Sequence, residues 1–431
     1  MKVRHWIIAA VAAALAFAAK TEDSALPVFA YTAASKYLPD ALAQGGERFP
    51  SGAAILLASP SGRQKLAPRF FASADPAVSF DGRNILFAAK TMATSHWQIW
   101  EVPASGGEPR QIVQCEDDCI RPLYLPDGRI VYTRVSSGGS QLEIAPLDGS
   151  APQRITFGPG RHITDDVLRD GRILYESDGE LFTVYPDGTG VESLRCDHGP
   201  RRTDARQLPS GDVIFTVGGK LARFTSARAS QVEVDQPKLE PAGPVAEIPG
   251  GRWIISLSRP GGLAGLYLWH RNGGRLVPIE TQPAGHALQP VAIQPRVPPK
   301  QFPSALVETR KTGNLLCLDA RASREPITGD VRTVQLYTRD EAGGSVLLGR
   351  QAVAGDGSFY VEVPADRPLR IELLDSSGRT VRAEHGWFWM RPSEQRICVG
   401  CHTGPERAPE NRVPEILLRS IVPEKMLGPT K

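Results

Sequence analysis

Residues 80–87 read Phe80-Asp81-Gly82-Arg83-Asn84-Ile85-Leu86-Phe87, a tight turn followed at once by an apolar run. Glycine closes such a turn because it adopts positive φ without steric cost, and the run after it is typical of a half-buried strand. The pattern returns four times along the chain. The five turn glycines are Gly82, Gly128, Gly171, Gly211 and Gly251, so the repeat measures 46, 43, 40 and 40 residues.

A second strand pair follows the turn in most repeats, as at 98–102, 142–144, 181–184 and 266–269. Two hairpins in 40–46 residues make one four-stranded blade, so the repeat predicts a β-propeller over residues 50–295. Residues 54–66 have the pattern of an outer half-blade, and residues 287–293 that of an inner strand. Joined, they complete a sixth blade that closes the ring. The alternative is a set of unrelated hairpins in a sandwich.

A proline-rich stretch ends the repeat, with five prolines between Pro290 and Pro303. Such a composition is typical of a stiff linker. Short strands separated by turn residues then continue to residue 390 and predict a small β-sandwich over 300–390. The predicted fold class is therefore all-β: a six-bladed propeller, a β-sandwich, and a short C-terminal segment over 391–431.

That last segment contains Cys398-Val399-Gly400-Cys401-His402. Two thiols at this spacing can each add to a vinyl group of haem, and the adjacent His402 is then placed to ligate the iron. The motif predicts one covalent haem c, bound through Cys398, Cys401 and His402. A zinc site and a dithiol redox pair are the alternatives.

A second axial ligand would come from upstream, where Met390 and His385 are the candidates. Methionine would raise the reduction potential and histidine would lower it, while an open position would permit chemistry on a small molecule. The alternative is that the aromatic run 387–389 and Met390 only wall the haem pocket.

The N-terminus has the pattern of a secretory signal peptide, residues 1–18. Lys2 and Arg4 precede a short apolar core, and Ala16-Phe17-Ala18 supplies a cleavage site. We therefore expect an exported, periplasmic protein with no membrane span in the mature chain. Fifty basic and 47 acidic residues give a net charge of +3, which argues against a nucleic-acid partner.

Other polar residues suggest weaker sites. In an oxidising compartment Cys115 and Cys119 can form a disulfide, or else bind a metal together with Asp117 or Asp118. Cys196 and Cys317 are expected to be buried or paired. The pair Asp165-Asp166 is expected to lie in a solvated loop, with contact to a cation or substrate as the alternative.

Two resemblances extend this interpretation. The Asp-Gly-Arg turns with their following strands resemble the propeller repeats of TolB. Several C-terminal strings resemble the middle domain of the hydrazine synthase alpha subunit family: Thr312-Gly313-Asn314-Leu315-Leu316-Cys317-Leu318-Asp319, Asp356-Gly357-Ser358-Phe359, Trp389-Met390-Arg391-Pro392-Ser393-Glu394, Cys398-Val399-Gly400-Cys401-His402 and Pro409-Glu410-Asn411-Arg412.

This second resemblance implies an exported haem-bearing redox protein with a propeller before its β domain. It also implies a zinc ion in the propeller next to the haem. Hydrazine synthesis itself is not implied, because Glu406 stands where that enzyme has an iron-ligating tyrosine, and because its further haem domain has no counterpart here.

Three functions are compatible with these patterns. The first is electron transfer to a redox partner protein, with the propeller as the docking surface. The second is a haem enzyme that acts on a small nitrogen or oxygen compound between propeller and haem. The third is a non-catalytic binding propeller.

Overall fold

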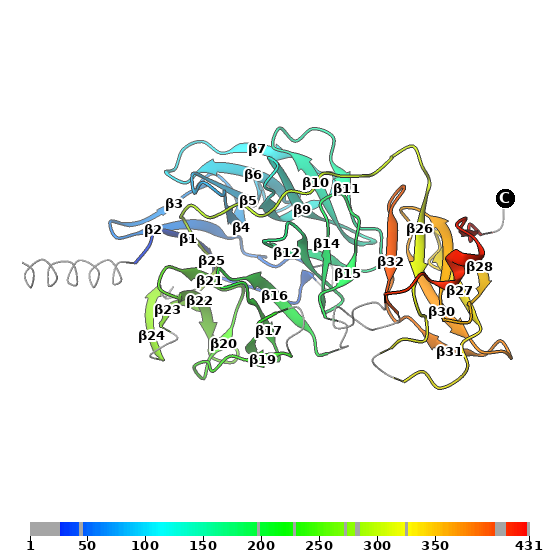
Figure 1. The fold of residues 1–431 in the computed structure, drawn as a ribbon. Helices are drawn as coiled ribbons and strands as arrows, with labels where there is room; N and C mark the ends of the chain where they lie inside the picture. The colour runs from blue at the N-terminus through cyan, green and yellow to red at the C-terminus, as the bar shows by residue number, and fades with distance from the viewer. Residues whose placement is uncertain are drawn as a thin grey trace, which may run out of the picture. The chain divides into compact units, whose positions relative to one another are not determined.

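The computed structural model describes residues 26–42, 46–195, 199–226, 230–270, 274–280, 285–323, 326–400 and 411–428. Strands dominate these residues, which confirms the predicted all-β class (Figure 1). The chain divides into two compact units. The first consists of Met1–Ser95, Ile99–Gln111 and Asp235–Val297, and the second of His96–Gln98, Ile112–Val234 and Pro298–Lys431.

Six sheets form the blades that the repeat predicted. Their strand orders are β25-β1-β2-β3, β4-β5-β6-β7, β11-β10-β9-β8, β12-β13-β14-β15, β16-β17-β18-β19 and β20-β22-β23-β24, with β21 also paired to β22. The strands of the first two sheets are β25 (His286–Ala292), β1 (Phe29–Ala34), β2 (Ala54–Ser59), β3 (Gly62–Lys65), β4 (Ala72–Val78), β5 (Asn84–Lys90), β6 (Gln98–Pro103) and β7 (Arg110–Val113).

The next two sheets contain β8 (Asp118–Tyr124), β9 (Arg129–Ser136), β10 (Gly139–Pro146), β11 (Gln153–Arg154), β12 (His162–Val167), β13 (Ile173–Ser177), β14 (Glu180–Val184) and β15 (Glu192–Ser193). The last two contain β16 (Arg202–Gln207), β17 (Val213–Val217), β18 (Lys220–Phe224), β19 (Val232–Glu233), β20 (Glu240–Pro241), β21 (Ala246–Ile248), β22 (Arg252–Ser258), β23 (Gly265–His270) and β24 (Arg275–Glu280).

The first sheet joins the two ends of the repeat region, as predicted. Strand β25 pairs antiparallel with β1, with Phe29 opposite Ala292, and β1 pairs with β2. Strand β1 itself was not predicted, because no turn glycine directly precedes Phe29. The half-blade at 54–66 and the strand at 287–293 therefore share a sheet through this additional strand.

Apolar side chains that alternate along the strands form the core of each unit. In the first unit, Ile55 and Leu57 of β2 pack with Ile85 and Phe87 of β5, and all four are buried. In the second unit, Leu174 of β13 belongs to another such cluster, which also contains side chains of β14 and of the next sheet. Burial of a side chain of this size contributes about 1.5–3 kcal/mol.

The first strand of several sheets carries an irregularity at one recurring place. The pairing register shifts between residues 74 and 77, 120 and 123, and 203 and 206, and a non-glycine residue with positive φ lies in each interval. These residues are Asp75, Arg121 and Asp204, with φ of 57°, 49° and 54°. Gln289 (φ 52°) occupies the corresponding place in β25. A bulge re-aims a side chain, and here each one re-aims a polar group.

The C-terminal part of the second unit is the predicted β-sandwich. One sheet has the order β32-β26-β29-β33 and the other β28-β27-β30-β31. Their strands are β26 (Thr312–Cys317), β27 (Thr333–Arg339), β28 (Ser345–Ala352), β29 (Phe359–Pro364), β30 (Leu369–Leu374), β31 (Thr380–Ala383), β32 (Gln395–Cys398) and β33 (Glu424–Lys425), and a short helix α2 (Glu415–Arg419) precedes β33. Both sheets contribute to one core, as Leu315 and Leu336 illustrate.

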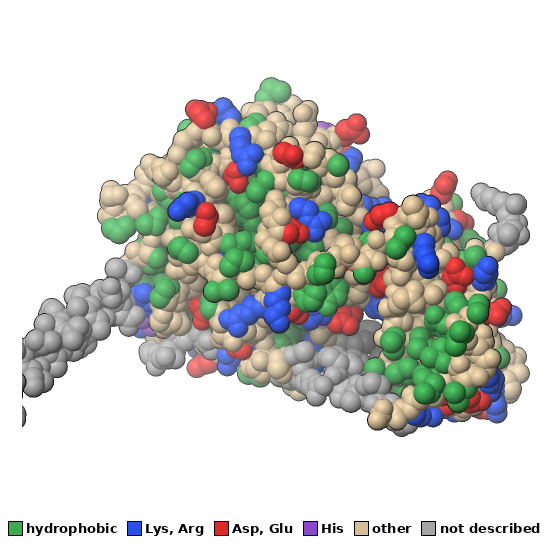
Figure 2. All heavy atoms as spheres, turned by 45° about the horizontal axis from the view of Figure 1, so that its top comes forward, with side chains coloured by type: hydrophobic (Ala, Val, Ile, Leu, Met, Phe, Trp, Pro, Cys, Tyr) green, Lys and Arg blue, Asp and Glu red, His purple; other side chains and the backbone are tan. Residues whose placement is uncertain are grey.

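The end of the proline-rich segment, from Pro298 onward, bonds blades of the second unit. Lys300 N donates to Arg169 O (3.1 Å), and Gln301 Nε2 donates to Pro126 O (2.6 Å). On the face drawn in Figure 2, basic and acidic side chains are interspersed, as the near-neutral composition predicts.

Candidate functional site

Strand β32 carries the first cysteine of the haem-attachment motif at its last residue. It pairs in parallel with β26, and Arg396 lies opposite Leu315 while Cys398 lies opposite Cys317. Cys398 is half-buried, packs against the sandwich core, and forms no disulfide with any described residue. Burial raises the pKa of its thiol, and the Arg396 charge partly opposes this effect. Cys401 and His402 lie outside the described residues.

The two candidates for the second axial ligand lie in different surroundings. The Met390 side chain is completely buried in the sandwich core, where a Cβ atom added to Gly313 would lie 3.1 Å from the Met390 Cβ. His385 is exposed and follows the end of β31. Met390 belongs to the core cluster against which Cys398 packs. Because Cys401 and His402 lie outside the described residues, a role as iron ligand stays a prediction for both Met390 and His385.

Hydrogen bonds connect the segment before β32 with the β12–β15 sheet of the same unit. Trp389 Nε1 donates to Gly188 O (2.9 Å), and Arg391 Nε donates to Asp187 O (2.9 Å). In return, Gly190 N donates to the Glu394 carboxylate (3.0 Å). These bonds fix the start of β32 beside the blade, within one compact unit.

A cavity of about 930 Å³ lies along this junction. Residues of the blades, of the linker and of β32 line this cavity, including Phe302 of the linker and Ile397 of β32. Four arginines also line it: Arg129, Arg172, Arg391 and Arg396. A volume of this size is in the range of ligand pockets. No local sequence pattern predicts this cavity, because its walls come from segments far apart in the chain.

His162 is a buried histidine at the same junction that the sequence analysis did not single out. Its ring stacks on Tyr175 (centroids 5.4 Å apart) and lies 5.8 Å from the Trp389 ring. The Nε2 atom faces Pro159 O at 3.3 Å, and Nδ1 is buried without a hydrogen-bond partner. Burial lowers the pKa of His162 to about 4, so its ring is neutral at pH 7.

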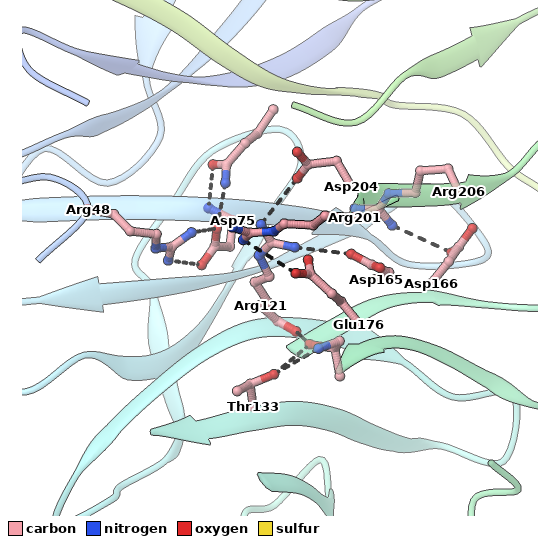
Figure 3. Close-up of polar contacts among 12 residues, drawn as sticks. Arg48, Asp75, Arg121, Thr133, Asp165, Asp166, Glu176, Arg201, Asp204 and Arg206 are labelled. Atoms are coloured by element: carbon pink, nitrogen blue, oxygen red, sulfur yellow. Dashed lines mark hydrogen bonds and ion pairs between the residues drawn. The ribbon is translucent and has the colours of Figure 1, made fainter. Parts of the chain in front are cut away.

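A second polar cluster surrounds Arg121 (Figure 3). The guanidinium of Arg121 donates to Asp165 at 3.1 Å and to Asp204 at 3.2 Å. Burial raises the pKa of Asp165 well above its usual value despite the Arg121 charge, and one oxygen of this carboxylate has no hydrogen-bond partner. Burial likewise raises the pKa of the nearby Glu176 to about 7.

This cluster corrects one expectation. Asp165 and Asp166 lie in strand β12 rather than in a solvated loop, and Asp165 is buried. Asp166 accepts a hydrogen bond from Gln207 N at 2.8 Å. The prediction failed because the side chains around Asp165 come from other strands, which the local sequence does not reveal.

Cys115 and Cys119 form a disulfide, with their Cα atoms 6.3 Å apart. The neighbouring carboxylates have protein partners: Arg134 Nε donates to Asp117 (3.0 Å), and Trp97 N donates to Asp118 (2.9 Å). Among the described residues, no three His, Cys, Asp or Glu side chains are placed to hold a metal ion. Cys196 lies outside the described residues, and Cys317 ends β26 as a buried residue.

Comparison with known proteins shows which family the region around Cys398 resembles. Residues 320–403 match the model of the hydrazine synthase alpha subunit middle domain. The hydrazine synthase subunit alpha of Kuenenia stuttgartiensis is 38% identical over 61 residues, which are 14% of this chain and 8% of that protein. A TolB homolog of Protochlamydia amoebophila is 27% identical over 124 residues, 25% of this chain and 26% of the homolog.

The similarity in fold extends further than the similarity in sequence. The solved Kuenenia stuttgartiensis hydrazine synthase matches with a TM-score of 0.79 over 91% of this chain and 72% of that one, at 17% identity. The resemblance to hydrazine synthase alpha and to TolB is thereby confirmed for the fold. Within the described residues, no helix combines the length and the apolar character needed to cross a bilayer.

Proposed function

We propose that this chain is an exported c-type haem oxidoreductase that acts on a small nitrogen or oxygen compound. The observation that carries the proposal is the position of Cys398. It ends an edge strand inside the region that matches the hydrazine synthase alpha middle domain, and it lies outside any disulfide among the described residues. Cys398 and Cys401 would hold the haem, and His402 would ligate its iron.

The described residues fit such a group. Beside the Cys398 thiol lies the Arg396 guanidinium, whose Nη1 atom is buried without a hydrogen-bond partner. Cys398 packs against the apolar cluster that contains Leu315, Cys317 and Met390, and an apolar wall of this kind suits a porphyrin ring. Arg396 also lines the cavity at the junction, so a reactant that enters this cavity would come close to strand β32.

When bound, the haem would supply one-electron chemistry, and the chain would control access and charge around it. The Trp389 and Arg391 bonds to the blade hold β32 in place. The neutral His162 ring adds no positive charge at pH 7. Phe302 and Ile397 give the cavity an apolar wall, and its four arginines are matched by four carboxylates: Asp187, Glu192, Glu308 and Glu394.

A second candidate is electron transfer to a redox partner protein. One observation favours it: the Ile397 side chain, next to Cys398, is 65% exposed on the edge strand of the sandwich. Exposed apolar groups near a redox centre suit transient docking of a partner.

Spectroscopy of the exported protein tests both candidates. Covalent haem is expected to remain on the polypeptide after denaturation. A high-spin ferrous form that binds carbon monoxide would support the enzyme, and a low-spin form with two strong axial ligands would favour the carrier. A wild-type protein that is secreted, folded and free of covalent haem, in a host that matures other c-type cytochromes, would contradict both.

A further inference from the structure

We propose that two linked turns of the sandwich, residues 319–322 and 354–358, form a clamp that fixes the position of the haem. Gly400, which lies against the first turn, and Asp356, which belongs to the second, are the positioning residues of this clamp. The inference rests on the proposed haem attachment at Cys398. Neither positioning residue is a thiol or imidazole that would bind the haem, so both act through the chain on either side of those groups.

The first argument is the contact between the end of β32 and the first turn. Leu318, directly before the turn, donates its N–H to Cys398 O at 2.9 Å. Two residues after Cys398, a Cβ atom added to Gly400 would overlap Ala322 O and lie 2.9 Å from Asp319 O. Both oxygens belong to the backbone, so they cannot swing aside as the end of a side chain can. Gly400 does not have a positive φ, so this contact, and not its backbone conformation, requires a residue without a side chain.

The first turn is itself firmly held. Ala320 and Ala322 are buried, and Ala322 N donates to Asp319 O at 3.1 Å. The Asp319 carboxylate accepts a hydrogen bond from Arg321 N at 3.0 Å. Because Ala320 also belongs to the sandwich core, the turn cannot make room for a larger residue at position 400 without moving part of that core.

The second argument is the contact between the second turn and the chain after the motif. The Asp356 carboxylate accepts from Glu415 N at 2.7 Å, and the Ser358 hydroxyl accepts from Ile416 N at 3.0 Å. In return, Asp356 N donates to the Glu415 carboxylate at 3.1 Å. Arg412 lies 3.8 Å from the Asp356 carboxylate, whose side chain is only 9% exposed. Hydrogen bonds to a charged group are among the stronger ones in proteins, so this side of the motif is also firmly held.

The two turns are connected, so they act as one clamp. Ala320 N donates to Gly357 O at 2.8 Å. A Cβ atom added to Gly357 would overlap the Asp319 carboxylate, so the two turns lie in direct contact. Gly400 precedes the rest of the motif and Glu415 follows it, and each of them is held by one of the turns. The chain therefore enters and leaves the rest of the motif at fixed places on the sandwich.

The consequence concerns the orientation of the haem. A group attached at Cys398 is held to the sandwich through a short piece of chain, and its orientation depends on how firmly that piece is held. Cys398 packs against the apolar cluster of the sandwich, so a firmly held ring would stay against this surface. A haem in one fixed, asymmetric environment gives strong circular dichroism in the Soret region, whereas a haem that reorients gives a weak signal. This signal separates a positioning role from a role in overall stability.

The first test compares Gly400→Ala with Gly138→Ala in the haem-loaded full chain. Both substitutions add one methyl group at a glycine without positive φ, but a Cβ atom at Gly138 would have no described atom within 4 Å. Gly400→Ala should keep its covalent haem, because both cysteines remain, yet lose most of the Soret circular dichroism per haem. Gly138→Ala should keep the wild-type signal. A Gly400→Ala protein with the wild-type signal would overturn the role of Gly400.

The second test compares Asp356→Ala with Asp375→Ala, which lies in a similar turn. Asp356 accepts from Ser358 N, and Asp375 accepts from Ser377 N, both at 2.9 Å, and each aspartate also pairs with an arginine. Of these two aspartates, only Asp356 is seen to bond the chain after the motif within the described residues. In urea, the ratio of displaced to held haem should be about tenfold higher in Asp356→Ala than in Asp375→Ala, because a hydrogen bond to a charged group contributes about that much. Equal ratios would overturn the role of Asp356.

Failure of the clamp and failure of the proposed function give different results. A wild-type protein without covalent haem refutes the proposed function. A wild-type protein that carries covalent haem but shows no Soret circular dichroism overturns the clamp alone. If Gly400→Ala does not fold, the comparison of Asp356→Ala with Asp375→Ala decides the inference, since neither substitution changes a residue of the motif.

Discussion

Cys398 lies directly opposite Cys317 in the parallel pairing of β32 with β26, and Leu318 N donates to Cys398 O at 2.9 Å. Two cysteines thus share one sheet position on neighbouring strands. Only one of them belongs to the proposed attachment motif, so each serves as a control for the other.

We predict that Cys398→Ala lowers the yield of covalently bound haem at least tenfold, whereas Cys317→Ala retains it. The reason is that Cys398 is three residues before Cys401 and can form the first thioether, while Cys317 is a core residue of β26. Haem staining of the denatured proteins measures the difference. Equal staining of both variants would contradict the assignment of Cys398.

We predict that Trp389→Phe destabilises the second unit by about 1 kcal/mol. The substitution keeps an aromatic ring but removes the Nε1 donor that bonds Gly188 O, and a hydrogen bond of this kind contributes about that much. Trp387→Phe is the matched control, because the Trp387 ring is only partly buried. Urea unfolding measures both, and an equal effect of the two substitutions would refute the role of the Gly188 contact.

We predict that His162 makes the protein sensitive to acid. Its pKa is about 4 in the folded chain and about 6.5 when unfolded, so folding favours the neutral ring. The stabilisation is complete above pH 6.5 and is lost as the pH falls toward 4, by up to about 3 kcal/mol. His162→Gln should remove this dependence. Thermal unfolding between pH 4 and 7 measures it, and parallel curves for the two proteins would exclude the effect.

We predict the opposite pH dependence for Glu176. Its pKa is about 7 in the folded chain, above the ordinary value of 4.5, so folding favours the protonated carboxyl. This contribution is complete below pH 4.5 and is lost as the pH rises through 7, again by up to about 3 kcal/mol.

Glu176→Gln should therefore be more stable than the wild type at pH 8 and similar to it at pH 5. Glu180→Gln, in the next strand, is the matched control. As the pH rises, the His162 contribution to stability increases and the Glu176 contribution decreases over most of this range. The two effects oppose each other in the wild type, so only the single variants reveal each pH dependence. A Glu176→Gln protein that loses stability at pH 8 would contradict the prediction.

The sequence predicted the repeated hairpins because their determinants are local. Gly82, Gly128 and Gly171 all have positive φ, and each is followed by a strand with a run of consecutive buried residues. The bulges at Arg121 and Asp204 have no such signal, since a non-glycine residue at positive φ cannot be recognised from its neighbours. The burial of His162 was equally hidden, because Trp389 reaches it from the C-terminal third of the chain.

The site was predictable only in part. The motif itself is local, and it singled out Cys398. The surroundings of Arg396 depend on three facts that no local pattern contains: the parallel pairing with β26, the donated bond to Val191 O, and the hydrogen bond to the Cys398 thiol. The cavity is formed by blade loops, linker and β32 together, and its walls become neighbours only after folding.

The pairing of β1 with β25 also determines the order in which the protein can mature. Phe29 emerges early from the ribosome, yet its partner Ala292 follows only after all the other blades have been synthesised. Until then, β1 can bond only β2, and its other edge stays open to incorrect pairing. Because such distant contacts form slowly, completion of this sheet is a late event in biogenesis. A chain truncated before residue 286 would keep that edge unpaired and would be prone to aggregation.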